Sequence, residues 1–281
     1  MPLSLALPTP LEYFASLVQS DAQFPLLETA ASLAMDEYPA LDIQALLEDV
    51  DQLGARLART VARGDPALER LRALNQFFFV DLGFAGNVND YYDAENSYLN
   101  SVLRTRRGIP ISLAVLWLEL AQGLGLHARG VAFPGHFMVK ALLPRGQVLI
   151  DPFTGESLSR EELLERLAPF QPGGAEGAEP PLGLYLQAAQ PREIIARMLR
   201  NLKEVHRANS DWQRLLAVQE RLVLLLPAAW DELRDRGLAH AECGHAALAI
   251  SDLETYLAHV RGDDNTELLA ERLQTLRRAM P

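Results

Sequence analysis

Three polar residues near the middle of the chain are of the types that carry out nucleophilic catalysis. Ser112 opens an apolar helical segment, His136 lies in a strand-like run, and Asp151 ends another such run. A hydroxyl, an imidazole and a carboxylate can act as nucleophile, base and orienting group, with the imidazole taking the proton of the attacking hydroxyl. The types and order of these residues therefore predict a catalytic set of Ser112, His136 and Asp151.

Each of these residues also has a structural explanation. Serine is preferred at helix N-caps, a histidine among apolar residues is often a core residue, and aspartate is common in turns that end strands. Strand geometry decides whether the relay can form, because side chains alternate between the two faces of a sheet. An even-numbered loop, which the segment 142–145 permits, puts His136 and Asp151 on the same face; an odd-numbered loop separates them.

A second group of residues is predicted to line a cleft beside the relay. Its members are Tyr92, Asn96, Asn100, Arg107, Pro110 and Phe133. Aromatic and amide side chains in a loop can contact a ligand, or they can satisfy the backbone groups of that loop. Arg106 and Arg107 could bind an anionic group, or they could pair with the carboxylates of the 90–95 segment in exposed ion pairs of little energetic value.

The apolar pattern predicts the elements that must position these side chains. From residue 11 to about residue 82 the spacing is typical of amphipathic helices, and the apolar run 113–118 predicts a buried helix over 112–124. Short β-rich segments at 128–133, 137–143 and 148–151 are separated by turns with proline and glycine, which predicts a small antiparallel sheet. A helix over 160–167 follows, so the first domain is predicted to be α+β.

The second half of the chain is predicted to be a helical repeat. Residues 171–184 are rich in proline and glycine and are predicted to be a linker between domains at 11–170 and 185–281. A 34-residue offset aligns His206 with His240, and 34 residues is the period of tetratricopeptide repeats; a generic helical bundle is the alternative. Such repeats present a concave face, so the predicted partner is a protein or a peptide bound by the C-terminal helices.

Composition excludes several classes of function. The 281 residues include 26 basic and 37 acidic side chains, and the net charge of -11 disfavours binding to nucleic acid or anionic lipid. No apolar run approaches the roughly 20 residues of a membrane helix, and the N-terminal segment lacks the basic region of a signal peptide. Cys243 is the only cysteine, and neither metal-ligand spacing nor a cofactor motif is present, so we expect a cytoplasmic protein without metal or cofactor.

Four motifs together resemble the bacterial SirB-type branch of the transglutaminase-like superfamily. They are Asn96–Asn100, Arg107–Ser112, Pro134–Phe137 and Asp151–Phe153. The resemblance extends over most of the chain, because that branch also carries a C-terminal tetratricopeptide region. It implies a papain-like α+β core in which a nucleophilic cysteine at a helix start is followed by histidine and aspartate on strands. It thereby implies Ser112 at the nucleophile position, His136 as base and Asp151 as orienting group.

Serine in place of cysteine changes the implied chemistry. A thiol beside a protonated imidazole can be held as a thiolate at neutral pH, whereas a serine hydroxyl must lose its proton to the base during attack. The leading prediction is a protein-interaction or regulatory protein whose Ser-His-Asp site is weakly active or silent. The alternatives are a serine-dependent hydrolase or acyltransferase acting on a peptide amide or ester, and a purely structural subunit without a binding cleft.

Overall fold

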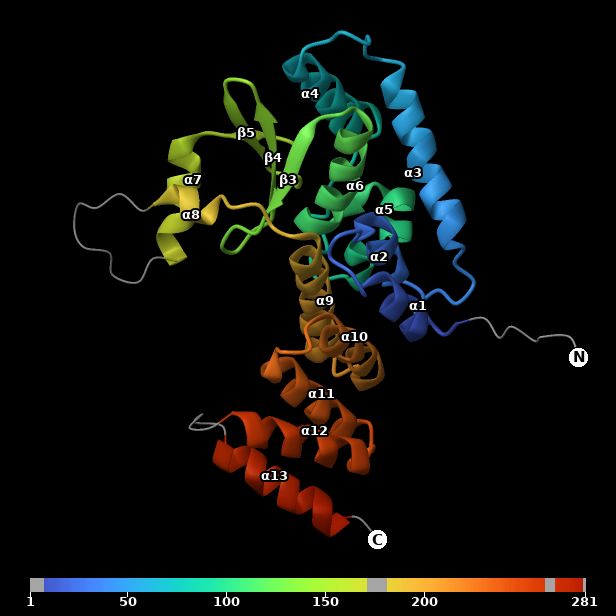
Figure 1. The fold of residues 1–281 in the computed structure, drawn as a ribbon, viewed down its shortest axis with the longest axis vertical. Helices are drawn as coiled ribbons and strands as arrows, with labels where there is room; N and C mark the ends of the chain where they lie inside the picture. The colour runs from blue at the N-terminus through green and yellow to red at the C-terminus, as the bar shows by residue number, and fades with distance from the viewer. Residues whose placement is uncertain (1–7, 171–180, 261–265, 280–281) are drawn as a thin grey trace, which may run out of the picture. The chain divides into compact units, whose positions relative to one another are not determined.

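The computed structural model of the chain describes residues 8–170, 181–260 and 266–279. The chain divides into two compact units: Phe24–Ile195, called the core unit, and Met1–Gln23 with Ala196–Pro281, called the repeat unit. The described part of the repeat unit is helical, whereas the core unit combines helices with two small sheets (Figure 1). The α+β fold class predicted from the sequence is therefore confirmed.

Helices make up most of the core unit. They are α2 (Leu26–Ser32), α3 (Ile43–Ala58), α4 (Ala67–Asn75), α5 (Leu99–Thr105), α6 (Pro110–Gly123), α7 (Arg160–Leu167) and α8 (Leu182–Tyr185). A π-helical segment, Gln76–Asp81, continues α4, and 3-10 turns occupy Ala94–Ser97 and Ala168–Phe170. Local capping sets some of the ends: the Asp42 side chain accepts from Ala45 N at the start of α3, and Ser159 with Glu162 forms a capping box at α7.

The core unit is built around α6. Ten of its 14 residues are buried, including Trp117, whose indole nitrogen donates to Asn75 Oδ1 at 3.0 Å. The helix contacts α3 and the strands β3 (His127–Val131) and β4 (Met138–Leu143), and it lies between them in Figure 1. A helix that is apolar on all sides is stable only when it is covered on all sides, which explains its central place. It begins two residues earlier than the predicted helix.

An antiparallel sheet with the strand order β3–β4–β5–β6 lies beside α6; β5 is Gly146–Ile150 and β6 is Ser157–Leu158. Leu143 pairs with Gly146, so the loop between β4 and β5 contains two residues. Val139 lies opposite Ile150, so Asp151 follows the end of β5 next to the start of β4, and His136 lies in the turn that leads into β4. A second sheet consists of β1 (Ala85–Gly86) and β2 (Arg107–Gly108), which run parallel.

The repeat unit is a succession of helices in which sequence neighbours pack together. Its helices are α1 (Pro10–Leu17), most of α9 (Pro191–Ala208), α10 (Trp212–Leu225), α11 (Trp230–Glu242), α12 (Ala246–His259) and α13 (Thr266–Ala279). Gly237 allows α11 to approach α12 closely, because a Cβ at this position would lie 3.0 Å from Asp252 Cβ. His206 and His240, which the 34-residue offset aligns, are both buried.

The two compact units divide the chain at other residues than the predicted domains, 11–170 and 185–281. That these two ranges are separate folding domains stays a prediction. Helix α1 contacts α10 and so belongs to the repeat unit, a long-range contact that local periodicity does not reveal. Of the predicted linker 171–184, residues 171–180 lie outside the described residues. Its end is helical rather than extended, and Leu182 is buried against Phe133 and Met138. The composition of this segment, rich in proline and glycine, does not predict the short helix α8.

Candidate functional site

His136 and Asp151 meet at one end of the four-stranded sheet. His136 lies in the turn before β4, and Asp151 directly follows β5. The distance between His136 Nε2 and Asp151 Oδ1 is 2.7 Å. With Nε2 bonded to the carboxylate, Nδ1 is the ring nitrogen left to exchange a proton with another group. The structure thus brings the predicted base and its orienting group together.

A tight turn presents the imidazole. Gly135 has a φ of 67°, a backbone conformation that favours glycine, and a Cβ on this residue would lie 2.4 Å from Phe170 Cζ, so the exposed Phe170 ring would have to move. The turn is closed by His136 N, which donates to Phe133 O at 3.1 Å. The His136 side chain is 22% exposed and that of Asp151 is 3% exposed. The imidazole therefore links a buried carboxylate to the surface.

Two further groups hold the Asp151 carboxylate. Arg166 Nη1 donates to Asp151 Oδ2 at 2.8 Å, and Phe153 N donates to Asp151 Oδ1 at 2.9 Å. Burial by itself raises the pKa of Asp151, but hydrogen bonds from His136, Arg166 and the Phe153 N–H, with the electrostatic attraction of the His136 ring when it is protonated, hold this pKa below its ordinary value. Asp151 is therefore ionised and fixed in orientation at neutral pH.

Arg166 is the member of this cluster that sequence reasoning missed. It is the basic residue in the last turn of α7, whose start is fixed by the Ser159 and Glu162 capping box. The helix over 160–167 was predicted, and it follows the strand that carries Asp151 after a short connection. A basic residue in the last turn of such a helix was a possible signal for a carboxylate partner, but the sequence does not define how α7 packs on the sheet.

Ser112 is not hydrogen-bonded to His136. It is the third residue of α6 and has no exposed surface. Its hydroxyl lies 2.6 Å from Asn96 O and 3.0 Å from Ile109 O, and it accepts from Ile109 N at 3.2 Å. All of these partners are backbone groups. A serine at this position reaches back to the backbone of the N-cap residue, as side chains at the third helical position commonly do.

The first residue of α6 is Pro110, and the N-cap is Ile109. Proline suits this position, because its φ is already helical and its missing N–H would have no partner within the helix. Residues in an α-helix are rotated by about 100° from one to the next, so Ser112 and Pro110 lie about 200° apart around the helix axis. Ser112 therefore occupies a different side of the first turn from the residue that begins the helix.

Two of the predicted cleft residues support the loop in which they lie. Asn96 is buried; its Nδ2 donates to Asp90 O at 2.6 Å, and its Oδ1 accepts from Asn87 Nδ2 at 3.0 Å. Arg107 is exposed and donates through Nη1 to Gly83 O at 2.7 Å. These contacts match the alternative that polar side chains in this region satisfy loop backbone groups.

Tyr92, another predicted cleft residue, is 79% exposed. Its ring packs edge-on against Tyr91, and the Tyr91 ring lies 6.0 Å from that of Phe153, two residues after Asp151. The aromatic group of Tyr91, Tyr92 and Phe153 thus includes the residue whose backbone N–H binds the Asp151 carboxylate. Such a group suits contact with a peptide or another protein.

The remaining cleft candidates lie elsewhere. Phe133 is fully buried in the core with Met138 and Leu149, and Pro110 is buried at the start of α6, so neither offers surface to a ligand in this structure. Asn100 lines a separate cavity between α3 and α5. Phe133 and Pro110 therefore belong to the packed interior of the core unit, and the predicted cleft stays a prediction.

Neither a metal cluster nor a membrane-spanning helix is found in the described ranges. Residues 8–170, 181–260 and 266–279 contain no group of three or more His, Cys, Asp or Glu side chains placed to hold a metal ion. None of the helices in these ranges is both long enough and apolar enough to cross a membrane.

Comparison with known families matches the two predicted regions in their predicted order. A model described as the transglutaminase-like superfamily matches residues 44–200, more than half of the chain. A model described as a tetratricopeptide repeat matches residues 202–274. A transglutaminase-like region followed by tetratricopeptide repeats is therefore confirmed.

Individual relatives come from bacteria and are called UPF0162 proteins. The chain is 38% identical to one from Xylella fastidiosa (strain Temecula1) over 257 residues, 91% of each chain. It is 31% identical to one from Pseudomonas aeruginosa over 246 residues, 87% of each chain. It is 26% identical to YchA of Escherichia coli K12 over 241 residues, 85% of this chain and 87% of YchA. Among solved structures, menin gives a TM-score of 0.39 with 12% identity, covering 97% of this chain and 84% of menin.

Proposed function

We propose, from the premise that this chain belongs to the transglutaminase-like superfamily and to the UPF0162 family, that it acts as a protein-interaction or regulatory protein with a silent Ser-His-Asp site. The tetratricopeptide match supports a role in binding a protein partner. The proposal includes membership of the SirB-type branch and a cytoplasmic location, for which the single cysteine, Cys243, is a supporting observation.

The observation that carries the proposal is the environment of Ser112. A serine nucleophile needs its hydroxyl within about 2.6–3.2 Å of the base and open to the carbonyl carbon it attacks. The Ser112 hydroxyl is instead fully buried and bonded to the backbone of Asn96 and Ile109. The helix-start position of the wider superfamily is better matched by Pro110, the first residue of α6, which has no nucleophilic group.

The His136 pair has a role in this proposal that needs no covalent chemistry. Its partly exposed imidazole is oriented by an ionised carboxylate, and Phe153, whose N–H also binds that carboxylate, packs against Tyr91. An oriented imidazole can hydrogen-bond a peptide group, and exposed aromatic rings can cover apolar side chains of a partner. We therefore assign His136 a part in partner recognition.

Site-specific photo-cross-linking tests the interaction role. Leu268 of α13 is 67% exposed and lines a groove of about 590 Å³ with Leu238 and Arg272 of the repeat unit. A chain carrying p-benzoylphenylalanine in place of Leu268 should form one discrete cross-linked product in cells. The same residue in place of Val80, which is 65% exposed in the core unit, is the matched control. No discrete product at Leu268, or the same product at both positions, would contradict the proposal.

The alternative is a serine-dependent hydrolase or acyltransferase, which the 2.7 Å contact between His136 and Asp151 favours. In that reaction Ser112 Oγ would attack the carbonyl carbon of an amide or ester while His136 takes the hydroxyl proton. The bond to the amine or alcohol would then break, with His136 returning the proton to this leaving group, and water would release the acyl group from Ser112 in the hydrolase. A fluorophosphonate probe, which phosphonylates activated serines, distinguishes the two. We expect equal, background labelling of the wild type and Ser112→Ala. Labelling that is lost in both Ser112→Ala and His136→Ala would establish the enzyme. A purely structural subunit would give neither labelling nor a cross-link.

A further inference from the structure

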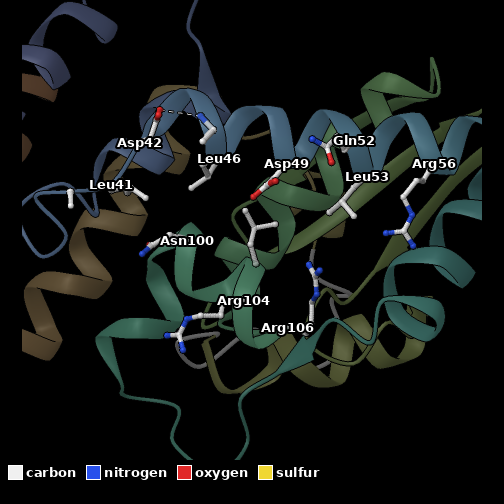
Figure 2. A pocket seen from close by; sticks show the side chains of 13 residues that line it. Leu41, Asp42, Leu46, Asp49, Gln52, Leu53, Arg56, Asn100, Arg104 and Arg106 are labelled. Atoms are coloured by element: carbon white, nitrogen blue, oxygen red, sulfur yellow. Dashed lines mark hydrogen bonds between the residues drawn. The ribbon is translucent and has the colours of Figure 1, made fainter.

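A second cavity lies in the core unit between α3 and α5, and Figure 2 shows the side chains that line it. Its volume is about 520 Å³, within the usual range for ligand sites. It follows α3 from Asp42 to Arg56, which at 1.5 Å per helical residue is a length of about 21 Å. The cavity is therefore an elongated groove, and none of its lining residues belongs to the His136 cluster.

Two arginines at one end of this groove form no ion pair within the described residues. Arg56 projects from α3 and Arg106 from the end of α5, toward the same part of the groove (Figure 2). Their guanidinium groups lie over the rings of Phe77 and Phe84, at 5.5 Å and 4.6 Å from the ring centroids. Neither guanidinium forms a hydrogen bond or ion pair with the described residues, and Arg106 Nη1 is buried without a partner. Arg104, the third arginine of the groove, lies 3.8 Å from Glu95.

The backbone holds Arg106 in this position. Its φ is 59°, a left-handed conformation that is uncommon for residues other than glycine and that persists only where the surroundings fix it. Burial lowers the pKa of the Arg106 guanidinium, and the neighbouring charge of Arg56 lowers it further, while Asp49 acts in the opposite direction. An anionic ligand group placed between the two arginines would relieve their repulsion and give Arg106 Nη1 an acceptor.

The rest of the groove is suited to a peptide rather than to a compact anion. Leu46 and Leu53 of α3 and Leu103 of α5 supply apolar wall, and Asn100 Oδ1 is a buried acceptor without a partner. Asp49 faces the same space and would repel a multiply charged group such as phosphate. A peptide brings N–H donors for the free acceptor, apolar side chains for the wall and a singly charged carboxylate for the arginines.

We propose that the groove between α3 and α5 binds an extended peptide segment whose carboxylate is held by Arg56 and Arg106. An extended chain advances about 3.3 Å per residue, so about six residues fill the groove. The carboxylate comes from an acidic side chain or from a C-terminus, because both present the same planar oxygen pair to a guanidinium. This site adds a second peptide contact to the one proposed for the repeats, and it does not depend on that contact.

Matched peptide libraries test the proposal on the full-length chain. The probes are immobilised N-acetyl hexapeptide amides of randomised Ala, Leu, Ser and Val, with one fixed Glu in the first library and Gln at that position in the second. A third library has no Glu and a free C-terminal carboxylate. We expect the chain to prefer the Glu or the free-acid library over the Gln library by roughly fivefold, because Gln can keep a neutral hydrogen bond where a carboxylate makes a charge-assisted one about twice as strong.

Single arginine variants assign the binding to the groove. Arg106→Ala and Arg56→Ala should each reduce the preference to background, whereas Arg59→Ala, at the C-cap of the same helix but outside the groove, should retain it. Arg56→Ala keeps the test valid if Arg106→Ala does not fold, because alanine is the best helix former and Arg56 is exposed. Equal binding to all libraries, or a preference that survives Arg56→Ala, would overturn the proposal. Binding of inorganic phosphate without any peptide preference would overturn it as well.

Discussion

Replacing Ser112 by alanine should lower the stability of the core unit. The hydroxyl donates to Asn96 O at 2.6 Å and accepts from Ile109 N at 3.2 Å, and both bonds are buried. Each such bond contributes about 0.5–1.5 kcal/mol net, so we expect a loss of about 1–3 kcal/mol. The loss stays in this range because Ile109 N also donates to Asn96 O at 3.3 Å, so neither backbone group is left without a partner.

Urea unfolding measures this change if the signal comes from the core unit alone. Trp117 is buried in α6, while Trp212 and Trp230 lie in the repeat unit, so the fluorescence is followed in a Trp212→Phe, Trp230→Phe background. Ser157→Ala, an exposed serine on β6, is the matched control and should change the free energy of unfolding by less than about 0.5 kcal/mol.

The sign of the result separates the two roles of Ser112. A structural serine gives a less stable chain and no change in any serine-directed labelling. A catalytic serine gives an alanine variant that is at least as stable as the wild type and has lost serine-directed labelling, because catalytic groups are often held at some cost to stability. An alanine variant as stable as the wild type would refute a structural role for the Ser112 hydroxyl.

Three further outcomes follow from particular contacts. Gly237→Val should destabilise the repeat unit by about 1–3 kcal/mol, since even a Cβ at this position would lie 3.0 Å from the Asp252 side chain of α12. The change is measured as a lower melting temperature, and Gly64→Ala, where an added Cβ would have no atom within 4 Å, is the control. In Asp151→Asn the free energy of unfolding of the core unit should fall less steeply in acid than in the wild type. The pKa of Asp151 is lower in the folded chain than its ordinary value of 3.8, so its ionisation stabilises the fold at pH values above 3.8, and this stabilisation is lost as the pH falls through the folded pKa. In Ser112→Cys the buried thiol should react with iodoacetamide more slowly than the partly exposed Cys243; faster, His136-dependent alkylation would indicate an activated site.

The sequence predicted those parts of the fold that local patterns determine. The apolar run 113–118 predicted α6, and the β-rich segments around two short turns predicted the strands next to His136 and Asp151, while the loop parity that decides whether the two side chains meet was left open. The 34-residue offset likewise identified the helix pairs of the repeat unit, where Gly237 packs against α12. These features depend on residues close in sequence or on a fixed period, both of which can be recognised without coordinates.

Long-range contacts were the features that the sequence did not reveal. The packing of α1 on α10 and the contact of Arg166 with Asp151 join segments whose spacing carries no directional information. The orientation of Arg106 depends on one left-handed backbone angle at a residue that is not glycine. In contrast, the position of Ser112 was open to prediction, because proline at the first helical position is a known start signal and places Ser112 third in the helix.

The Asp151 cluster offers a reason why a catalytic-type pair would persist without a nucleophile. The carboxylate accepts hydrogen bonds from His136, from Arg166 and from the backbone of Phe153, and it is almost fully buried. Removing one partner from a buried charge leaves that charge uncompensated, which is more costly than the net value of the intact pair. Loss of either His136 or Asp151 would therefore disturb the loop after β5 and the packing of α7. A constraint of this kind acts on folding alone, so the presence of the His136–Asp151 pair is weak evidence for catalysis. The hydrogen-bond partners of Ser112 are stronger evidence, because they decide whether its hydroxyl can act as a nucleophile.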